Sequence, residues 1–138
     1  MTFLVDANIL SELTKQSPHQ GVVNWFRTNE AESAVDAIIL GEIFAGILAL
    51  PRGRKRAQLL HWFDSVVDTI QCLPFDATTS RCWAKLIVDL KAKGKSMPVI
   101  ESLIAATALT HGLILATRNV RDFQHTGIKI VDPFDEAT

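Results

Sequence analysis

The sequence has few cysteines and no long hydrophobic run. Its two cysteines, Cys72 and Cys82, are too few and too ordinarily spaced for a disulfide framework or a thiolate metal site. Charged residues interrupt every apolar run well short of the roughly 18 residues that span a membrane, and the segment 1–6 has no basic stretch followed by an apolar one. We therefore expect a reduced, cytoplasmic protein that neither enters a membrane nor is secreted.

The chain also has no excess of charge of one sign. It carries 14 Lys and Arg against 15 Asp and Glu, a formal net charge of −1, so bulk charge provides no general attraction to nucleic acid. A polyanion would have to bind a local patch. The stronger candidate contains Arg52, Arg54, Lys55 and Arg56, and a weaker one is the stretch 91–95. Either run could instead be an ordinary solvated turn or helix face.

The pattern of the remaining residues indicates one compact α/β domain over residues 1–138. With 48% hydrophobic and 21% charged residues, 138 residues can bury roughly two-thirds of their unfolded surface. Short apolar segments alternate with stretches of helical periodicity, which favours a central parallel sheet of about five strands flanked by helices. The expected strands are 3–5, 34–37, 70–73, 113–116 and 128–131, and the expected helices are 9–13, 21–29, 38–50, 59–67, 76–94 and 99–111.

Four polar positions, dispersed along the chain, lie inside or at the edge of these apolar segments. Asp6 and Asn119 follow expected strands, and Glu42 and Glu101 lie on expected helices, with Asp122 close to Asn119. Ligands of open α/β sheets bind beyond the carboxyl ends of the strands, so we expect Asp6 and Asn119 to share one rim. A carboxylate near a helix start could point to the same rim, which suits Glu101, three residues after a proline.

Crowded carboxylates repel one another unless a cation compensates them, and hard oxygen ligands favour Mg²⁺ or Mn²⁺. A metal site of this kind typically activates water and stabilises charge on a phosphate, which makes phosphodiester hydrolysis the natural hypothesis. Each residue also has a purely structural interpretation. Asp6 or Asp122 could cap a helix, and Glu101 could be a first-turn carboxylate favoured by the helix dipole. Glu42 could be solvated, and Asn119 could belong to a turn.

Four segments together resemble the PIN-domain family, specifically the VapC/FitB-type toxins of type II toxin–antitoxin modules. They are residues 4–12 (LVDANILSE), 40–47 (LGEIFAGI), 103–108 (LIAATA) and 116–123 (ATRNVRDF), which occur in family order and span nearly the whole chain. Each piece alone is weak, but the set is specific.

The resemblance implies a PIN-like fold and a Mg²⁺- or Mn²⁺-dependent endoribonuclease. It places the acidic catalytic residues at Asp6, Glu42 and Glu101, with Asn119 as the fourth metal position. As further expectations, Asn8, Thr117 and Asp122 would support these ligands, and the RNA backbone would meet basic side chains. Those side chains are Arg52, Arg54, Lys55, Arg56 and Arg118.

The resemblance also implies partners: an RNA substrate, with tRNA a candidate, a cognate antitoxin, DNA only through that antitoxin, and a second copy of the chain in a homodimer. Three positions depart from the family pattern. Glu101 stands where Asp is usual, which moves the carboxylate out by one methylene, and Ala7 replaces a Thr whose hydroxyl could orient a ligand. Asp36 stands where Ser is common, a change that the sequence does not explain.

Two other functions remain open at this point. A weakened site could survive in a protein that serves only as an antitoxin-binding co-repressor scaffold, a possibility that Ala7 and Glu101 raise. An α/β phosphohydrolase acting on a small phosphate ester would use similar acids.

Overall fold

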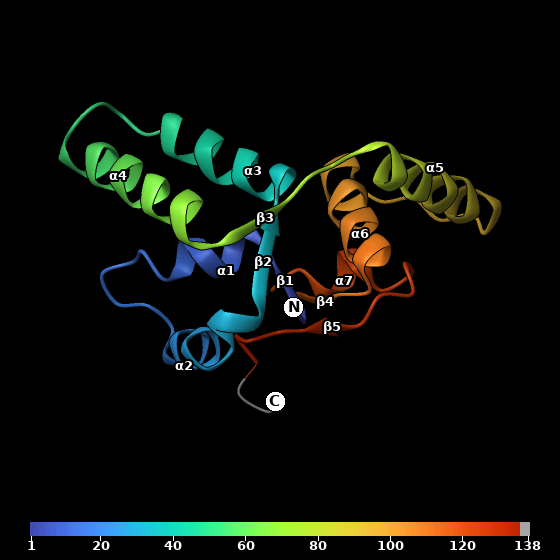
Figure 1. Ribbon diagram of the computed structural model, residues 1–138, viewed down its shortest axis with the longest axis horizontal. Coiled ribbons are helices and arrows are strands. Elements are labelled where there is room, and N and C mark those ends of the chain that lie inside the picture. The colour runs from blue at the N-terminus through green and yellow to red at the C-terminus, as the bar shows by residue number, and fades with distance from the viewer. Residues whose placement is uncertain (136–138) are drawn as a thin grey trace.

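The computed structural model describes residues 1–135 and contains a five-stranded parallel sheet (Figure 1). The strand order is β3-β2-β1-β4-β5, with every neighbouring pair parallel. The expected α/β fold with a central parallel sheet is thus confirmed. The strands are β1 (Phe3–Val5), β2 (Ser33–Asp36), β3 (Gln71–Leu73), β4 (Ile114–Ala116) and β5 (Ile130–Val131).

Helices connect the strands and cover the sheet. They are α1 (Ala7–Glu12), α2 (Gln20–Asn29), the short 3-10 helix η1 (Glu30–Glu32), α3 (Ala37–Leu48), α4 (Arg54–Thr69), α5 (Ala77–Ala92), α6 (Val99–His111) and α7 (Val120–Phe123). In Figure 1 the α3–α4 pair lies at the upper left and the α5–α6 pair at the right, so the two pairs flank the sheet at opposite ends of the long axis. Within residues 1–135, no helix is long and apolar enough to span a membrane.

The central strand β1 sets the register of the sheet. Leu4 and Val5 are fully buried, and β1 pairs with β2 on one side and with β4 on the other. On the β4 side, Val5 lies opposite Ala116. Because all strands are parallel, their carboxyl ends meet at one edge of the sheet, and the residues that follow them are brought together there.

Side-chain caps fix where several helices begin. Asp36 Oδ1 accepts a hydrogen bond from the Ile39 N–H at the start of α3 (2.8 Å), and Asp76 Oδ1 accepts one from the Thr79 N–H at the start of α5 (3.1 Å). These bonds satisfy backbone donors that have no partner within the helix. At the other end of α6, Gly112 adopts a left-handed conformation (φ 63°), which a residue with a side chain rarely adopts.

Several element ends and two short helices, η1 and α7, differ from the sequence-based expectations. The last strand is shorter than predicted, at Ile130–Val131, and helix α4 starts earlier, so that the basic residues 54–56 form its first turn. The short helix α7 was not expected, because four residues carry too little periodicity to recognise. Its Phe123 is fully buried and anchors it against the core.

We predict that Phe123→Ala lowers the free energy of unfolding by about 3–5 kcal/mol, because it leaves a cavity where a fully buried ring was. Val120→Ala, on the same short helix but 39% exposed, should lower it by less than about 1 kcal/mol. Urea unfolding of both variants measures the difference. Equal losses would show that Phe123 is not the anchor of α7.

Candidate active site

Asp6 is the residue around which the carboxyl edge of the sheet is organised. It follows β1 directly, caps α1 and is only 4% exposed. Its Oδ1 accepts a hydrogen bond from the Ala7 N–H (2.7 Å), and its Oδ2 accepts one from Thr117 Oγ1 (2.7 Å) and one from Asn8 Nδ2 (3.3 Å). Burial raises the pKa of Asp6, while these three donors, Thr117 foremost, act in the opposite direction.

Thr117 joins the end of β4 to this carboxylate. Its hydroxyl donates to Asp6 and accepts hydrogen bonds from Asn8 Nδ2 (3.2 Å) and from the Asn119 N–H (3.0 Å). One donor and two acceptor sites are all that a hydroxyl has, so its proton is directed at Asp6. Asn8 completes the link, because its Oδ1 accepts from the Arg118 N–H (3.1 Å). The structure therefore connects Asp6, Asn8 and Thr117 in one hydrogen-bond network.

Asp36 is a further acid at this edge to which the sequence analysis gave no role. It ends β2, is fully buried, and its Oδ2 accepts a short hydrogen bond from Thr107 Oγ1 of α6 (2.6 Å). Desolvation raises its pKa, and the nearby charge of Asp6 adds to this effect. Its position at the carboxyl end of an expected strand, the same as that of Asp6, was the signal that could have identified it.

Glu42 and Glu101 approach the same edge from helices. Glu42 lies in the second turn of α3, Glu101 lies in the first turn of α6, and both are half-buried. The pKa of Glu42 is raised from 4.5 to about 7, by desolvation most of all and then by the charges of Asp6, Glu101 and Asp36. The carboxylates of Asp6, Asp36 and Glu101 thus lie close enough to Glu42 to oppose its ionisation.

The donor set fits a divalent cation in its chemistry. The acids are oxygen ligands, and a positive ion would offset the negative charges of Asp6, Asp36 and Glu101, which add to desolvation in raising the pKa of Glu42. Within residues 1–135, however, no three Asp, Glu, His or Cys side chains are already arranged to hold an ion. The carboxylates therefore lie near enough to one another for their charges to affect Glu42, but within residues 1–135 they are not arranged as a complete set of metal ligands.

Asn119 and Asp122 lie on the outer rim of this edge. Both are exposed, and Asn119 precedes α7 without a side-chain hydrogen bond to its backbone. They line an open depression of about 570 Å³, together with Arg118 and Arg121. The structure thus brings Asn119 next to the Asp6 network through its backbone N–H, while Asp122 stays one helical turn further out.

The basic run lies away from the acids. Arg52 and Arg54 are exposed at the junction of α3 and α4, at the far end of α3 from Asp36. The twelve residues of α3 give a separation of about 18 Å. Arg54 and Lys55 line a cavity of about 760 Å³ with Lys15 from the α1–α2 loop. Of the basic residues expected to meet RNA, only Arg118 lies at the acidic edge.

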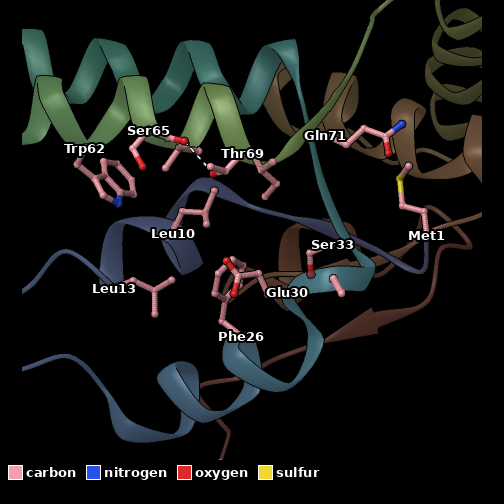
Figure 2. Close-up of a pocket in the computed structure, with 13 residues that line it drawn as sticks. Met1, Leu10, Leu13, Phe26, Glu30, Ser33, Trp62, Ser65, Thr69 and Gln71 are labelled. Carbon is pink, nitrogen blue, oxygen red and sulfur yellow. Dashed lines mark hydrogen bonds between the residues drawn. The ribbon is translucent and has the colours of Figure 1, made fainter.

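A separate cavity of about 570 Å³ lies at the opposite, amino-terminal edge of the sheet (Figure 2). Ser33 and Gln71, the first residues of β2 and β3, line it. In Figure 2, Trp62 of α4 faces Leu13 and Phe26 across this cavity. Its location separates it from the acids, so we do not include it in the candidate active site.

Comparison with known proteins supports the resemblance noted from the motifs. The PIN domain family model matches residues 3–129. VapC ribonuclease Y4jK of Sinorhizobium fredii is 33% identical over 97% of this chain and 99% of its own length. Toxin FitB of Neisseria gonorrhoeae is 28% identical over 96% and 99%, and the tRNA(fMet)-specific endonuclease VapC of Shigella flexneri is 24% identical over 92% and 93%.

A solved structure has nearly the same fold. A chain in the structure of FitAB bound to an IR36 DNA fragment superposes with a TM-score of 0.91 at 27% identity, covering 97% of this chain and 96% of that one. The family match covers most of the sequence, and the parallel sheet and its acidic edge agree with it. The chain therefore belongs to the PIN domain family, among its VapC- and FitB-type members.

Proposed function

We propose that this protein is a metal-dependent endoribonuclease that acts as the toxin of a toxin–antitoxin pair. The observation that carries the proposal is the convergence of Asp6, Asp36, Glu42 and Glu101 on one edge of the sheet, where desolvation and the charges of the other three acids raise the pKa of Glu42 to about 7. Relatives named as VapC ribonucleases and as a toxin support this function. The α/β domain over residues 1–138 would be the whole catalytic unit.

In this proposal Asp6, Glu101 and Asn119 hold a Mg²⁺ or Mn²⁺ ion, with Glu42 beside them. The ion supplies Lewis-acid chemistry at the phosphate and at the attacking water. Glu42 is suited to accept a proton from that water, because a cation beside it would counteract the rise in its pKa and favour its carboxylate form at neutral pH. Thr117 and Asn8 hold the Asp6 carboxylate in place, and Asp36 supports the α3–α6 contact through Thr107.

The substrate in this proposal is single-stranded or looped RNA, in which a phosphate can be turned toward a shallow site. A tRNA is a candidate substrate, because the Shigella flexneri relative is named a tRNA(fMet)-specific endonuclease. Arg118 would meet the backbone at the cleavage rim. Arg52, Arg54, Lys55 and Arg56 would meet it a few nucleotides away.

We further propose that a cognate antitoxin inhibits the protein, that the protein reaches DNA only through that antitoxin, and that it forms homodimers. The structural relative was solved as FitAB bound to a DNA fragment, which supports a DNA-bound complex, while the homodimer is an implication of the family resemblance. Bulk charge gives this chain no general affinity for DNA of its own. We also propose that the protein acts in the cytoplasm, where it would meet RNA.

Asp6→Asn should abolish RNA cleavage while the fold is retained, because the amide cannot replace a charged ligand. Excess chelator should do the same to the wild-type protein, and Mg²⁺ or Mn²⁺ should restore its activity. Cleavage of total RNA, followed on gels, measures both effects. Asp64→Asn, an exposed acid on α4, is the control and should cleave normally. Robust cleavage by Asp6→Asn, or in chelator, would overturn the proposal.

Mn²⁺ should raise the melting temperature of the protein, because an ion that binds only the folded state stabilises it by about 2.7 kcal/mol at a concentration 100 times its Kd. This rise should be lost in Asp6→Asn and in Glu101→Gln. Glu101→Asp should keep it, since it retains the charge and carries the side chain usual in the family. If Glu101→Gln responds to Mn²⁺ as the wild type does, Glu101 is not a ligand.

The metal-free protein should lose stability as the pH rises from 5 to 8. Below pH 7 the folded state holds a proton on Glu42 that the unfolded state has already released near pH 4.5, so the free energy of unfolding falls through this window. Because Glu42 is half-exposed, solvent screening limits its part to roughly 1–2 kcal/mol. Urea unfolding at pH 5 and at pH 8 measures this fall in the free energy of unfolding, which should be smaller in Glu42→Gln than in the wild type.

The control for this pH effect is Glu30→Gln, an exposed acid at the other edge of the sheet, which should keep the wild-type pH profile. A wild-type profile in Glu42→Gln would contradict the assigned origin of the effect.

A protein that does not cleave RNA when purified, and does not arrest growth when expressed alone, would favour the co-repressor scaffold over the nuclease.

A further inference from the structure

The C-terminal segment contacts the rim of the candidate active site through one aromatic ring. The guanidinium carbon of Arg118 lies 4.5 Å from the centre of the Phe134 ring. A guanidinium placed over an aromatic face is attracted by it, and its in-plane N–H groups remain directed outward, able to donate to a phosphate. Arg118 also lines the open depression that contains Asn119 and Arg121.

Arg118 is held at both of its ends. Its backbone N–H donates to Asn8 Oδ1 (3.1 Å), and Asn8 also contacts Asp6 and Thr117. The backbone of Arg118 is thus part of the network that orients the candidate catalytic carboxylate. The ring of Phe134 then restricts the long side chain, which would otherwise lose considerable rotamer freedom when it binds a ligand.

Phe134 is itself fixed by local contacts. Its N–H donates to Asp132 Oδ1 (2.9 Å), and the preceding Pro133 is buried. The ring also packs against His19, with the two ring centres 5.4 Å apart. A Cβ added at Gly21 would lie 2.9 Å from His19 Cε1 and 3.2 Å from the Pro133 carbonyl oxygen, so the start of α2 and the C-terminal segment approach each other closely.

His19 connects this contact back to α1. Its backbone N–H donates to Glu12 Oε2 (2.9 Å), and its Nδ1 accepts from the Val22 N–H (3.3 Å). Glu12 is a buried carboxylate of α1, and Lys15 pairs with it at 2.8 Å. The contacts therefore run from α1 through Glu12, His19 and Phe134 to Arg118, and return to α1 at Asn8.

We propose that Phe134 is a positioning residue, which holds the guanidinium of Arg118 at the rim so that it can bind a backbone phosphate of the RNA. This inference rests on the proposed ribonuclease function. It assigns a role to a residue far along the chain from Asp6, Asp36, Glu42 and Glu101, one that no motif of the candidate site contains. Phe134 would act only through Arg118, without touching the reacting atoms.

The test is a double-mutant cycle on the full-length protein, measured as the Kd for a 20-nucleotide single-stranded RNA of mixed sequence in chelator, where cleavage is off. Phe134→Leu should weaken binding by about 2- to 5-fold, the range expected for an exposed cation–π contact. Arg118→Gln should weaken it at least as much and reduce the slope of log K against log salt by about 0.7. In the Arg118→Gln background, Phe134→Leu should have no further effect.

Two controls separate positioning from a general structural role. Phe134→Trp keeps an aromatic face and should bind RNA as the wild type does, while melting curves establish that each variant is folded. Arg121→Gln removes the same charge from the same depression, so Phe134→Leu should still weaken binding in that background. Full additivity with Arg118→Gln, or unchanged binding by Phe134→Leu, would overturn the inference.

Cleavage of total RNA by the wild-type protein distinguishes a failure of the positioning role from a failure of the proposed ribonuclease function. If the wild type cleaves RNA but Phe134 and Arg118 do not couple, the positioning role is wrong and the ribonuclease function stands. If the wild type neither binds nor cleaves RNA, the proposed function fails, and the role of Phe134 fails with it.

Discussion

The hydrogen bond from the Thr117 hydroxyl to Asp6 is the interaction on which the candidate site depends. It joins the carboxyl ends of β4 and β1, two neighbouring parallel strands, at the point where the chain leaves the sheet. Without the Thr117 donor, the buried carboxylate of Asp6 would lose the hydrogen bond that most offsets the cost of its desolvation. With it, the acid, the amide of Asn8 and the backbone at Arg118 and Asn119 are held in one arrangement.

The same edge concentrates negative charge in a way that opposes folding. Asp6 and Asp36 are buried with raised pKa values, and the pKa of Glu42 reaches about 7 through desolvation first and the charges of nearby acids second. A protein selected for stability alone has no reason to gather these groups. Their convergence is therefore informative about function, since a bound cation would offset the negative charge that these carboxylates bring together.

Much of the architecture could be predicted from local patterns. The helix over residues 99–111 begins after Pro98 and ends before a left-handed Gly112, as its sequence indicates. Asp76 caps the helix that follows it, and the apolar segment 3–5 is the central strand. The short helix α7, the early start of α4 and the short β5 were not foreseen, because tertiary contacts such as the burial of Phe123 decide the ends of brief elements.

The sequence by itself identified the candidate site residues: Asp6, Glu42 and Glu101 stand out because acids inside apolar segments need a reason. Only the tertiary structure decided how they relate. Parallel pairing placed Asp36 beside Asp6, and it directed the single proton of Thr117 toward that carboxylate. It also placed the basic run at residues 52–56 about one helix length from the acids, and it placed the Arg118 guanidinium over the ring of Phe134. Contacts between residues far apart in the sequence form only when strands pair and helices pack, so no local sequence pattern predicts them.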